Sequence, residues 1–304
     1  MTRFFVACVV LVAFVGPATA GSPVPKPALI SFADARHGVA SFGSAAGWTA
    51  DGGRSWHHSR SGHLLTLDAI AGTRDVWAVV GATSCGRIPV ACDARLVHSM
   101  DGGRRWSPTG APLLGAAFAN RVDGWAFRPK NGIEYGRLVA TRDGGRSWHA
   151  AQDPCPRAQG KIAALASARH GWVLCLAEPG TGQQGKALFE TTDSARHWRV
   201  VNRTGSTPAG LPGSGYAEGM ALTARGFGLL WEARGDTYRT TDGGRTWRRL
   251  SLTSPELKEV VSASVVRRRL AFVLLRNGQT RRLELRRSDY GLRHWGIVRT
   301  WPLA

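Results

Sequence analysis

The chain repeats one short segment, and this repeat limits the possible fold more than any other feature. In five copies a Thr or Ser stands two positions before an aspartate, and a tryptophan stands five positions after it. The aspartates are spaced 42 to 50 residues apart along the chain. The copies are TADGGRSW (49–56), SMDGGRRW (99–106), TRDGGRSW (141–148), TTDSARHW (191–198), TTDGGRTW (240–247) and the irregular SDYGLRHW (288–295).

These residue types are typical of a corner between two β-strands. An aspartate carboxylate accepts hydrogen bonds from backbone N–H groups a few residues ahead, and glycine adopts positive φ without steric cost. The tryptophan then begins the next strand and packs its ring into the sheet. We call the six segments the Asp turns. Their defining residues are Asp51, Trp56, Asp101, Trp106, Asp143, Trp148, Asp193, Trp198, Asp242, Trp247, Asp289 and Trp295.

A second pattern precedes most copies: an apolar stretch, a polar turn and a Gly-aromatic restart. It is clear in residues 31–43, 117–127 and 165–175 and looser in 71–81 and 222–231. One repeat therefore reads as four strands, and a period of about 50 residues matches one four-stranded blade. The sequence predicts an all-β, six-bladed β-propeller with antiparallel blades. A seventh blade is disfavoured because no residues remain to build it.

With these segments in view, the chain resembles the Asp-box, or bacterial neuraminidase repeat, β-propeller superfamily. It looks most like bacterial relatives of the photosystem II assembly and stability factor family, and sortilin-type and xyloglucanase-type propellers share the same segment. The resemblance extends over residues 30–304 and is specific for fold rather than function. It implies that the Asp turns are structural corners at the blade periphery. Two copies depart from this pattern. In the fourth, Ser194 and Ala195 replace the two glycines, and the last copy has one extra residue between Asp289 and Trp295.

The N-terminus predicts export. Arg3 precedes an apolar run of about 12 residues, and Ala18-Thr19-Ala20 forms a small-x-small cleavage site. We therefore expect a signal peptide (1–20), a short linker (21–29) and the propeller (30–304). The expected location is secreted or cell-envelope associated, without a transmembrane span after cleavage.

Cysteine usage agrees with an oxidising compartment. Removal of the leader leaves four cysteines, an even number that allows three pairings. Local pairing is preferred, Cys85 with Cys92 and Cys155 with Cys175. No CxxC pair is present, so zinc is disfavoured.

The net charge is +19, and arginine supplies nearly all of the positive charge. Such a surface attracts anionic partners, although a GC-rich genome would produce the same arginine bias without selection for a ligand. The densest basic region is in the sixth repeat. The candidate polyanion contacts are Arg267, Arg268, Arg269, Arg281, Arg282, Arg286 and Arg287.

No catalytic residue, metal site or cofactor site could be assigned. Glycoside hydrolysis needs two carboxylates facing one sugar, and the sequence does not place any two opposite each other. Adjacent histidines such as His57 and His58 point to opposite faces of a strand and cannot readily share a metal. The favoured hypothesis is therefore a non-catalytic, monomeric binding or assembly scaffold of the bacterial cell envelope. Its partner would be an envelope protein or an anionic polymer, with no specific nucleic acid. The alternatives are a secreted sialidase- or xyloglucanase-like hydrolase and a photosystem assembly role.

Overall fold

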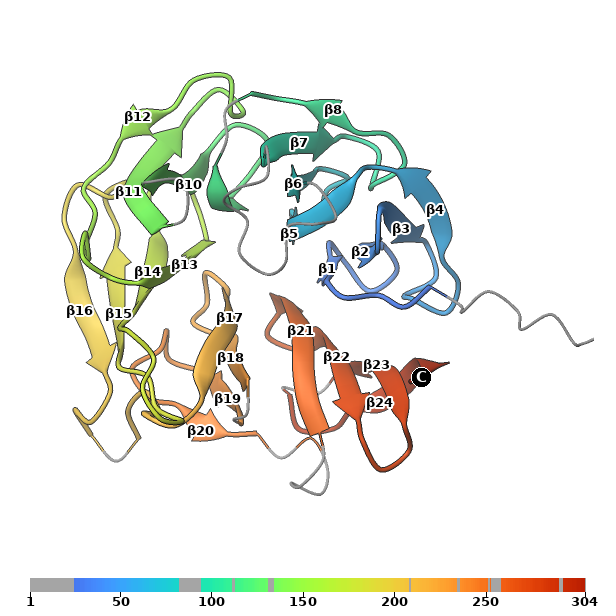
Figure 1. The fold of residues 1–304 in the computed structure, drawn as a ribbon. Coiled ribbons are helices and arrows are strands. Elements are labelled where there is room, and N and C mark those ends of the chain that lie inside the picture. Colours follow the sequence, from blue (N-terminus) through green and yellow to red (C-terminus); the bar gives the residue numbers. More distant parts are fainter. Residues whose placement is uncertain are drawn as a thin grey trace, which may run out of the picture.

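The fold is a ring of six four-stranded antiparallel sheets (Figure 1). The computed structural model describes residues 25–303 except 82–93, 111–112, 131–133, 208, 234–235, 251, 253–257 and 290–291. Within this part of the chain there is no α-helix, and hence none that could cross a lipid bilayer. The predicted six-bladed propeller with four-stranded antiparallel blades is confirmed.

Each blade is one continuous stretch of chain. Blade 1 contains β1 (Ile30–Phe32), β2 (Gly38–Phe42), β3 (Ala45–Thr49) and β4 (His57–Arg60). Blade 2 contains β5 (His63–Ala69), β6 (Val76–Gly81), β7 (Arg95–Ser99) and β8 (Ser107–Pro108). Blade 3 contains β9 (Leu114–Phe118), β10 (Gly124–Lys130), β11 (Glu134–Thr141) and β12 (His149–Ala150).

The second half of the ring repeats this order. Blade 4 contains β13 (Gly160–Leu165), β14 (Gly171–Leu176), β15 (Lys186–Thr191) and β16 (Arg199–Arg203). Blade 5 contains β17 (Tyr216–Leu222), β18 (Gly228–Ala233), β19 (Thr237–Thr240) and β20 (Arg248–Arg249). Blade 6 contains β21 (Lys258–Arg267), β22 (Leu270–Asn277), β23 (Arg282–Ser288) and β24 (Gly296–Pro302).

The meander order gives the ring two different faces. Because neighbouring strands are antiparallel, the turn after the first strand and the Asp turn after the third strand lie at the same end of each blade. We call the former the inner turns: 33–37, 70–75, 119–123, 166–170, 223–227 and 268–269. We call the surface formed by inner turns and Asp turns the turn face.

Backbone hydrogen bonds join the two turns of a blade. The N–H of Gly52 donates to Arg36 O (2.8 Å) and that of Gly102 to Arg74 O (2.9 Å). The N–H of Ser194 donates to Arg169 O (2.9 Å), and equivalent bonds are present in blades 3 and 5. In each of these five blades the inner turn and the Asp turn are therefore joined through the backbone and are not independent loops.

Adjacent blades are held together by apolar side chains between their sheets. At the junction of blades 2 and 3, the Trp77 ring is stacked between His98 and Phe118, with centroids 3.9 Å from each. Blade 6 closes on blade 1 without a shared strand. There Phe32 stacks on Phe272 at 3.6 Å, and the Ser262 and Ser264 hydroxyls accept the N–H groups of Ile30 and Phe32.

The Asp turns have a common internal geometry, which Asp51 illustrates. Its carboxylate accepts hydrogen bonds from Ser55 N (3.0 Å), Ser55 Oγ (2.6 Å) and Thr49 Oγ1 (2.8 Å). The N–H of Gly53 donates to Thr49 Oγ1 (2.9 Å), and the Trp56 indole donates to Gly53 O (3.0 Å). Each carboxylate of this kind is occupied by its own turn.

Blades 4 and 6 depart from this geometry. Ser194 and Ala195 keep the glycine conformation, with φ of 65° and 63°, and Trp198 donates to Gln152 O of blade 3. Asp289 was predicted to be a turn aspartate, but its side chain is 61% exposed and forms an ion pair with Arg287. Leu292 has φ of 65°, and its carbonyl accepts the Trp295 indole N–H, so this corner uses leucine where blades 1, 2, 3 and 5 use glycine.

We expect Asp51→Ala to lower the free energy of unfolding by about 1–2 kcal/mol, because it leaves the Ser55 N–H and hydroxyl without their acceptor. Asp289→Ala is the control and should cost less than about 0.5 kcal/mol. Urea denaturation of both variants measures the difference. Equal losses would show that Asp289 is also a structural turn residue.

Ser194→Gly should raise the melting temperature by about 2–4 °C, since glycine adopts the positive φ of this position without strain. Ala195→Gly is the contrast, because Ala195 is buried in the core and its removal offsets the backbone gain. Thermal unfolding followed by circular dichroism checks both. A lower melting temperature for Ser194→Gly would contradict the strain argument.

Candidate functional site

The seven arginines predicted to contact a polyanion do not form one patch. Exposed Arg267, Arg268 and Arg269 lie at the inner turn of blade 6, on the turn face. Exposed Arg281 and Arg282 follow β22 and lie at the opposite face.

The last two arginines of that prediction are engaged within the protein. Arg286 is 6% exposed; its Nε donates to Glu284 Oε2 (2.7 Å) and its Nη1 to Leu252 O (3.1 Å). The assignment of Arg286 to a ligand surface is therefore wrong. Arg287 is half-buried, pairs with Asp289 and donates to Ala35 O.

The turn face carries a more regular set of arginines than the sequence analysis identified. Five blades place an exposed arginine on the inner turn, and blade 6 places three beside it. All six Asp turns add at least one more. The inner-turn set is Arg36, Arg74, Arg121, Arg169, Arg225 and Arg267–Arg269, and the Asp-turn set is Arg54, Arg104, Arg105, Arg146, Arg196, Arg245 and Arg293.

Several of these guanidinium groups are oriented by the backbone. Arg54 Nη1 donates to Asp51 O (2.8 Å), Arg245 Nη1 to Asp242 O (2.6 Å), and Arg36 Nε to Ala50 O (3.2 Å). Arg104 is stacked over the Trp48 ring of blade 1 at 4.3 Å. One edge or face of each group is fixed, and the remaining N–H donors stay exposed.

The carboxylates of the same face are already bonded. At Asp143, hydrogen bonds from the Ser147 hydroxyl, the Ser147 N–H and the Thr141 hydroxyl lower the pKa to about 2. Asp34 accepts the Arg36 and His37 N–H groups and contacts His37 Nδ1 at 2.8 Å. The acidic groups are therefore satisfied locally, whereas most arginines of both sets have no carboxylate partner among the described residues.

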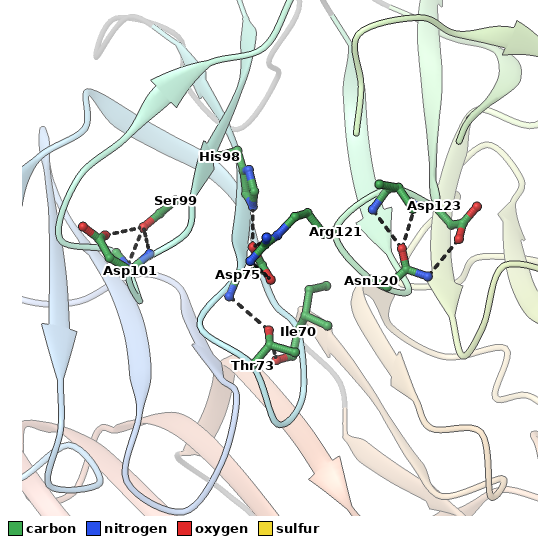
Figure 2. Close-up of polar contacts among 11 residues, drawn as sticks. Ile70, Thr73, Asp75, His98, Ser99, Asp101, Asn120, Arg121 and Asp123 are labelled. Carbon is green, nitrogen blue, oxygen red and sulfur yellow. Dashed lines mark hydrogen bonds and ion pairs between the residues drawn. The ribbon is translucent and has the colours of Figure 1, made fainter. Parts of the chain in front are cut away.

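Asp75 lies in a cluster between blades 2 and 3, shown in Figure 2. His98 Nε2 lies 3.0 Å from Asp75 Oδ1, and Arg121 of blade 3 donates through Nε (2.9 Å) and Nη2 (3.2 Å). Burial lowers the pKa of His98 and outweighs the opposing charge of Asp75. Asp75 is 5% exposed, so this carboxylate joins two blades and does not face solvent.

Blade 4 contains a similar group. Glu190 is buried, contacts His170 Nε2 at 2.8 Å and pairs with Arg199. Asp123 accepts the Asn120 amide at 2.8 Å, and Asp236 pairs with Arg249 at 2.6 Å. None of these carboxylates faces a second free carboxylate.

The loop between β14 and β15 of blade 4 ends at a lysine that forms a buried ion pair with blade 5. Lys186 Nζ lies 2.9 Å from Glu232 Oε1, and both side chains are fully buried. The ammonium also donates to Pro212 O (2.9 Å) and Ser214 O (3.2 Å). Burial raises the pKa of Glu232 to about 6 against the opposing effect of Lys186. This group fixes the loop to blade 5 and is closed to a substrate.

The predicted cysteine pairs are only partly visible. Cys155 and Cys175 form a disulfide that fixes the segment entering blade 4 to β14. Beside it, buried Lys161 pairs with Asp153 (2.5 Å), whose Oδ1 accepts the Cys155 N–H. Cys85 and Cys92 lie outside the described residues, as does the predicted signal peptide (1–20).

Among the described residues, no three His, Cys, Asp or Glu side chains gather in a way that could hold a metal ion. The feature that sequence reasoning missed is the arginine of the inner turns. A signal for it was present, because Arg36, Arg74, Arg121, Arg169 and Arg225 recur just before β2, β6, β10, β14 and β18.

No protein-family model matches the chain, and no curated protein matches it by sequence. Solved structures do match. YCF48 from Cyanidioschyzon merolae is similar with a TM-score of 0.53 and 13% identity, over 87% of this chain and 96% of that one. YCF48 bound to D1 peptide gives 0.50 and 15% identity, over 90% and 82%. The GH74 xyloglucanase from Xanthomonas campestris gives 0.51 and 15% identity, over 90% of this chain and 47% of that one. At these identities the likeness shows the fold alone.

The innermost strands carry one carboxylate with an unusual environment. Asp68 on β5 accepts the Phe118 N–H of blade 3 at 2.7 Å through Oδ2. Burial raises the pKa of Asp68 to about 6, and this single hydrogen bond opposes the rise. The folded state therefore binds a proton more tightly than the unfolded state, so this group lowers stability as the pH rises from about 4 to about 6.

We expect Asp68→Asn to stabilise the protein at pH 7.5 and to have little effect at pH 3.5, because asparagine keeps the acceptor without the charge. The full change in pKa would correspond to about 3 kcal/mol in the free energy of unfolding. Because the side chain is partly exposed, we expect a gain of about 1 kcal/mol. Urea denaturation at the two pH values measures it. The control is Asp51→Asn. Hydrogen bonds from Ser55 and Thr49 help to lower the pKa of Asp51, so this substitution should destabilise the protein at pH 7.5. A loss of stability for Asp68→Asn at pH 7.5 would contradict the assignment.

Proposed function

We propose that the chain is an exported, non-catalytic binding scaffold of the cell envelope that holds an acidic protein partner against its turn face. The observation that carries the proposal is the pair of arginine sets on one face, one set on the inner turns and one on the Asp turns. Both sets are exposed in the described residues, and each blade contributes to both. An extended, flat array of this kind is suited to a large anionic surface rather than to one small substrate.

The chemistry of the groups supports this reading. Arginine keeps its charge at every physiological pH and presents several N–H donors in a fixed plane, which suits carboxylates. The backbone bonds of Arg36, Arg54 and Arg245 reduce the side-chain entropy that binding would otherwise cost. The turn aspartates, which are the nearest anions, are hydrogen-bonded within their own turns and so do not compete with a partner for these arginines.

The structural neighbours are compatible with a protein-binding role. One neighbour is titled YCF48 bound to D1 peptide, so a propeller of similar fold binds a peptide. Export and an envelope location rest on the N-terminal leader sequence. The high arginine content has two explanations, selection for a binding face and a GC-rich genome. The variants below distinguish a specific binding face from a general excess of charge.

A glycoside hydrolase is the alternative, since a xyloglucanase shares the fold. Such an enzyme requires two carboxylates facing one sugar. Asp34, Asp75, Asp123, Asp236, Glu190 and Glu232 are each held by a cation, an amide or a backbone N–H group. This supports a scaffold over a hydrolase.

We expect the purified chain to bind poly-L-glutamate at low salt, with affinity falling steeply as salt rises. Replacing Arg36, Arg74, Arg169 and Arg225 together with glutamine should lower the affinity at least 10-fold. The matched control replaces four exposed arginines outside the turn face, Arg60, Arg128, Arg203 and Arg282. Fluorescence anisotropy of labelled polymer at 50 and 300 mM salt measures both.

Equal losses in the two quadruple variants would show that the charge acts nonspecifically and would remove the basis for a binding face. Turnover of aryl glycosides by the wild-type chain would favour the hydrolase.

A further inference from the structure

A crevice opens on the turn face where blade 1 meets blade 2. It is open to solvent, and only about 10 Å³ of it is enclosed, which is room for about one water-sized group. The polar side chains that line it include those of His37, Thr73 and Arg74, and the Trp48 ring also lines it. No carboxylate lines it.

Arg74 is held in position by its own blade. Its carbonyl accepts the Gly102 N–H, and its side chain lies over Gly102, where a Cβ would be 3.7 Å from Arg74 Nη1. The guanidinium forms no hydrogen bond or ion pair with a described residue. His37 Nδ1 faces Asp34 Oδ2 at 2.8 Å, so Nε2 is the ring nitrogen left for a ligand.

A second arginine lies beside the crevice. Arg104 lies 4.3 Å above one face of Trp48, and His57 stacks on this indole at 4.4 Å. Stacking on an aromatic ring fixes the plane of a guanidinium while leaving its N–H edge open. The positions of Arg74 and Arg104 are therefore set before any ligand arrives.

At the next junction, between blades 2 and 3, the chain's own Asp75 is held by His98 on one oxygen and by both Nε and Nη2 of Arg121 (Figure 2). A carboxylate can therefore lie between a histidine and an arginine where two blades meet. At the junction of blades 1 and 2 the strand register places His37 at the position of Asp75 and Trp48 at that of His98. No carboxylate of the described residues pairs with Arg74 there.

We infer that the crevice between blades 1 and 2 binds a carboxylate from outside, namely a Glu or Asp side chain of an acidic partner segment, with Arg74 and His37 as its direct contacts and Arg104 at the rim. The crevice as a carboxylate site rests on its own geometry. Its role as the anchor point of a partner rests on the proposed function of the turn face.

Glutarate is the test ligand, because it presents the glutamate side-chain carboxylate without a polymer. We expect saturable chemical-shift changes at the backbone amides of Gly38 and Gly102 in transverse-relaxation-optimised spectra of the deuterated full chain. Arg74→Gln should weaken the apparent affinity at least 10-fold. Arg169→Gln is the matched control, since Arg169 accepts the same Asp-turn hydrogen bond in blade 4, and it should change the affinity less than two-fold.

Unchanged glutarate affinity in Arg74→Gln, or shifts spread evenly over the turn face, would overturn the site. A second measurement separates this from failure of the proposed function. Arg74→Gln should weaken poly-L-glutamate more than dextran sulfate, whereas Arg169→Gln should weaken both equally. Loss of the glutarate site with intact polymer binding refutes only the crevice. An intact glutarate site without polymer binding refutes the binding face and the role of the crevice as an anchor.

Discussion

One backbone hydrogen bond, from the Asp turn to the inner turn of the same blade, determines much of what this protein presents to its surroundings. The N–H that donates belongs to the first residue after the aspartate, and its acceptor is the carbonyl of an inner-turn residue. At all five donors the backbone takes a positive φ. This explains why the donor is glycine in four blades; in blade 4 it is Ser194. The aspartate carboxylate then closes the turn by accepting hydrogen bonds from the N–H and hydroxyl groups that the bend would otherwise leave without a partner.

Charge follows from this arrangement. An inner turn whose carbonyl points toward the Asp turn directs its long side chain to solvent, and the third residue after the aspartate is likewise exposed. The acceptor is itself an arginine in blades 1, 2 and 4, and the third residue after the aspartate is an arginine in blades 1 to 5, so these positions place positive charge on the turn face. Of the inner-turn acids, Asp75 lies between two blades and pairs with His98 and Arg121, whereas Asp34 and Asp123 are bonded within their own turns.

The repeat made the fold predictable from sequence. The spacing of the aspartates defined the blades, and the inner hairpins of blades 1, 3 and 4 fell where the Gly-aromatic pattern indicated. The basic site was predicted less well, because a run of arginines on a strand says nothing about which of them face the core. Arg286 and Glu284 stand two residues apart on β23, so they share one face of the strand and pair there. The sequence did not indicate that this face is buried. The crevice between blades 1 and 2 could not be predicted, since it depends on side chains brought together by blade packing.

The absence of a shared strand at the junction of blades 6 and 1 has a consequence for how such a molecule can change over evolutionary time. Every sheet is complete within one contiguous segment, and side chains such as Phe32 and Phe272 provide the closure. Duplication or deletion of one segment of about 50 residues would leave no sheet with an orphaned strand. The ring could therefore gain or lose a sector while each surviving sector kept its internal bonds, and the number of blades would be free to vary as a heritable trait.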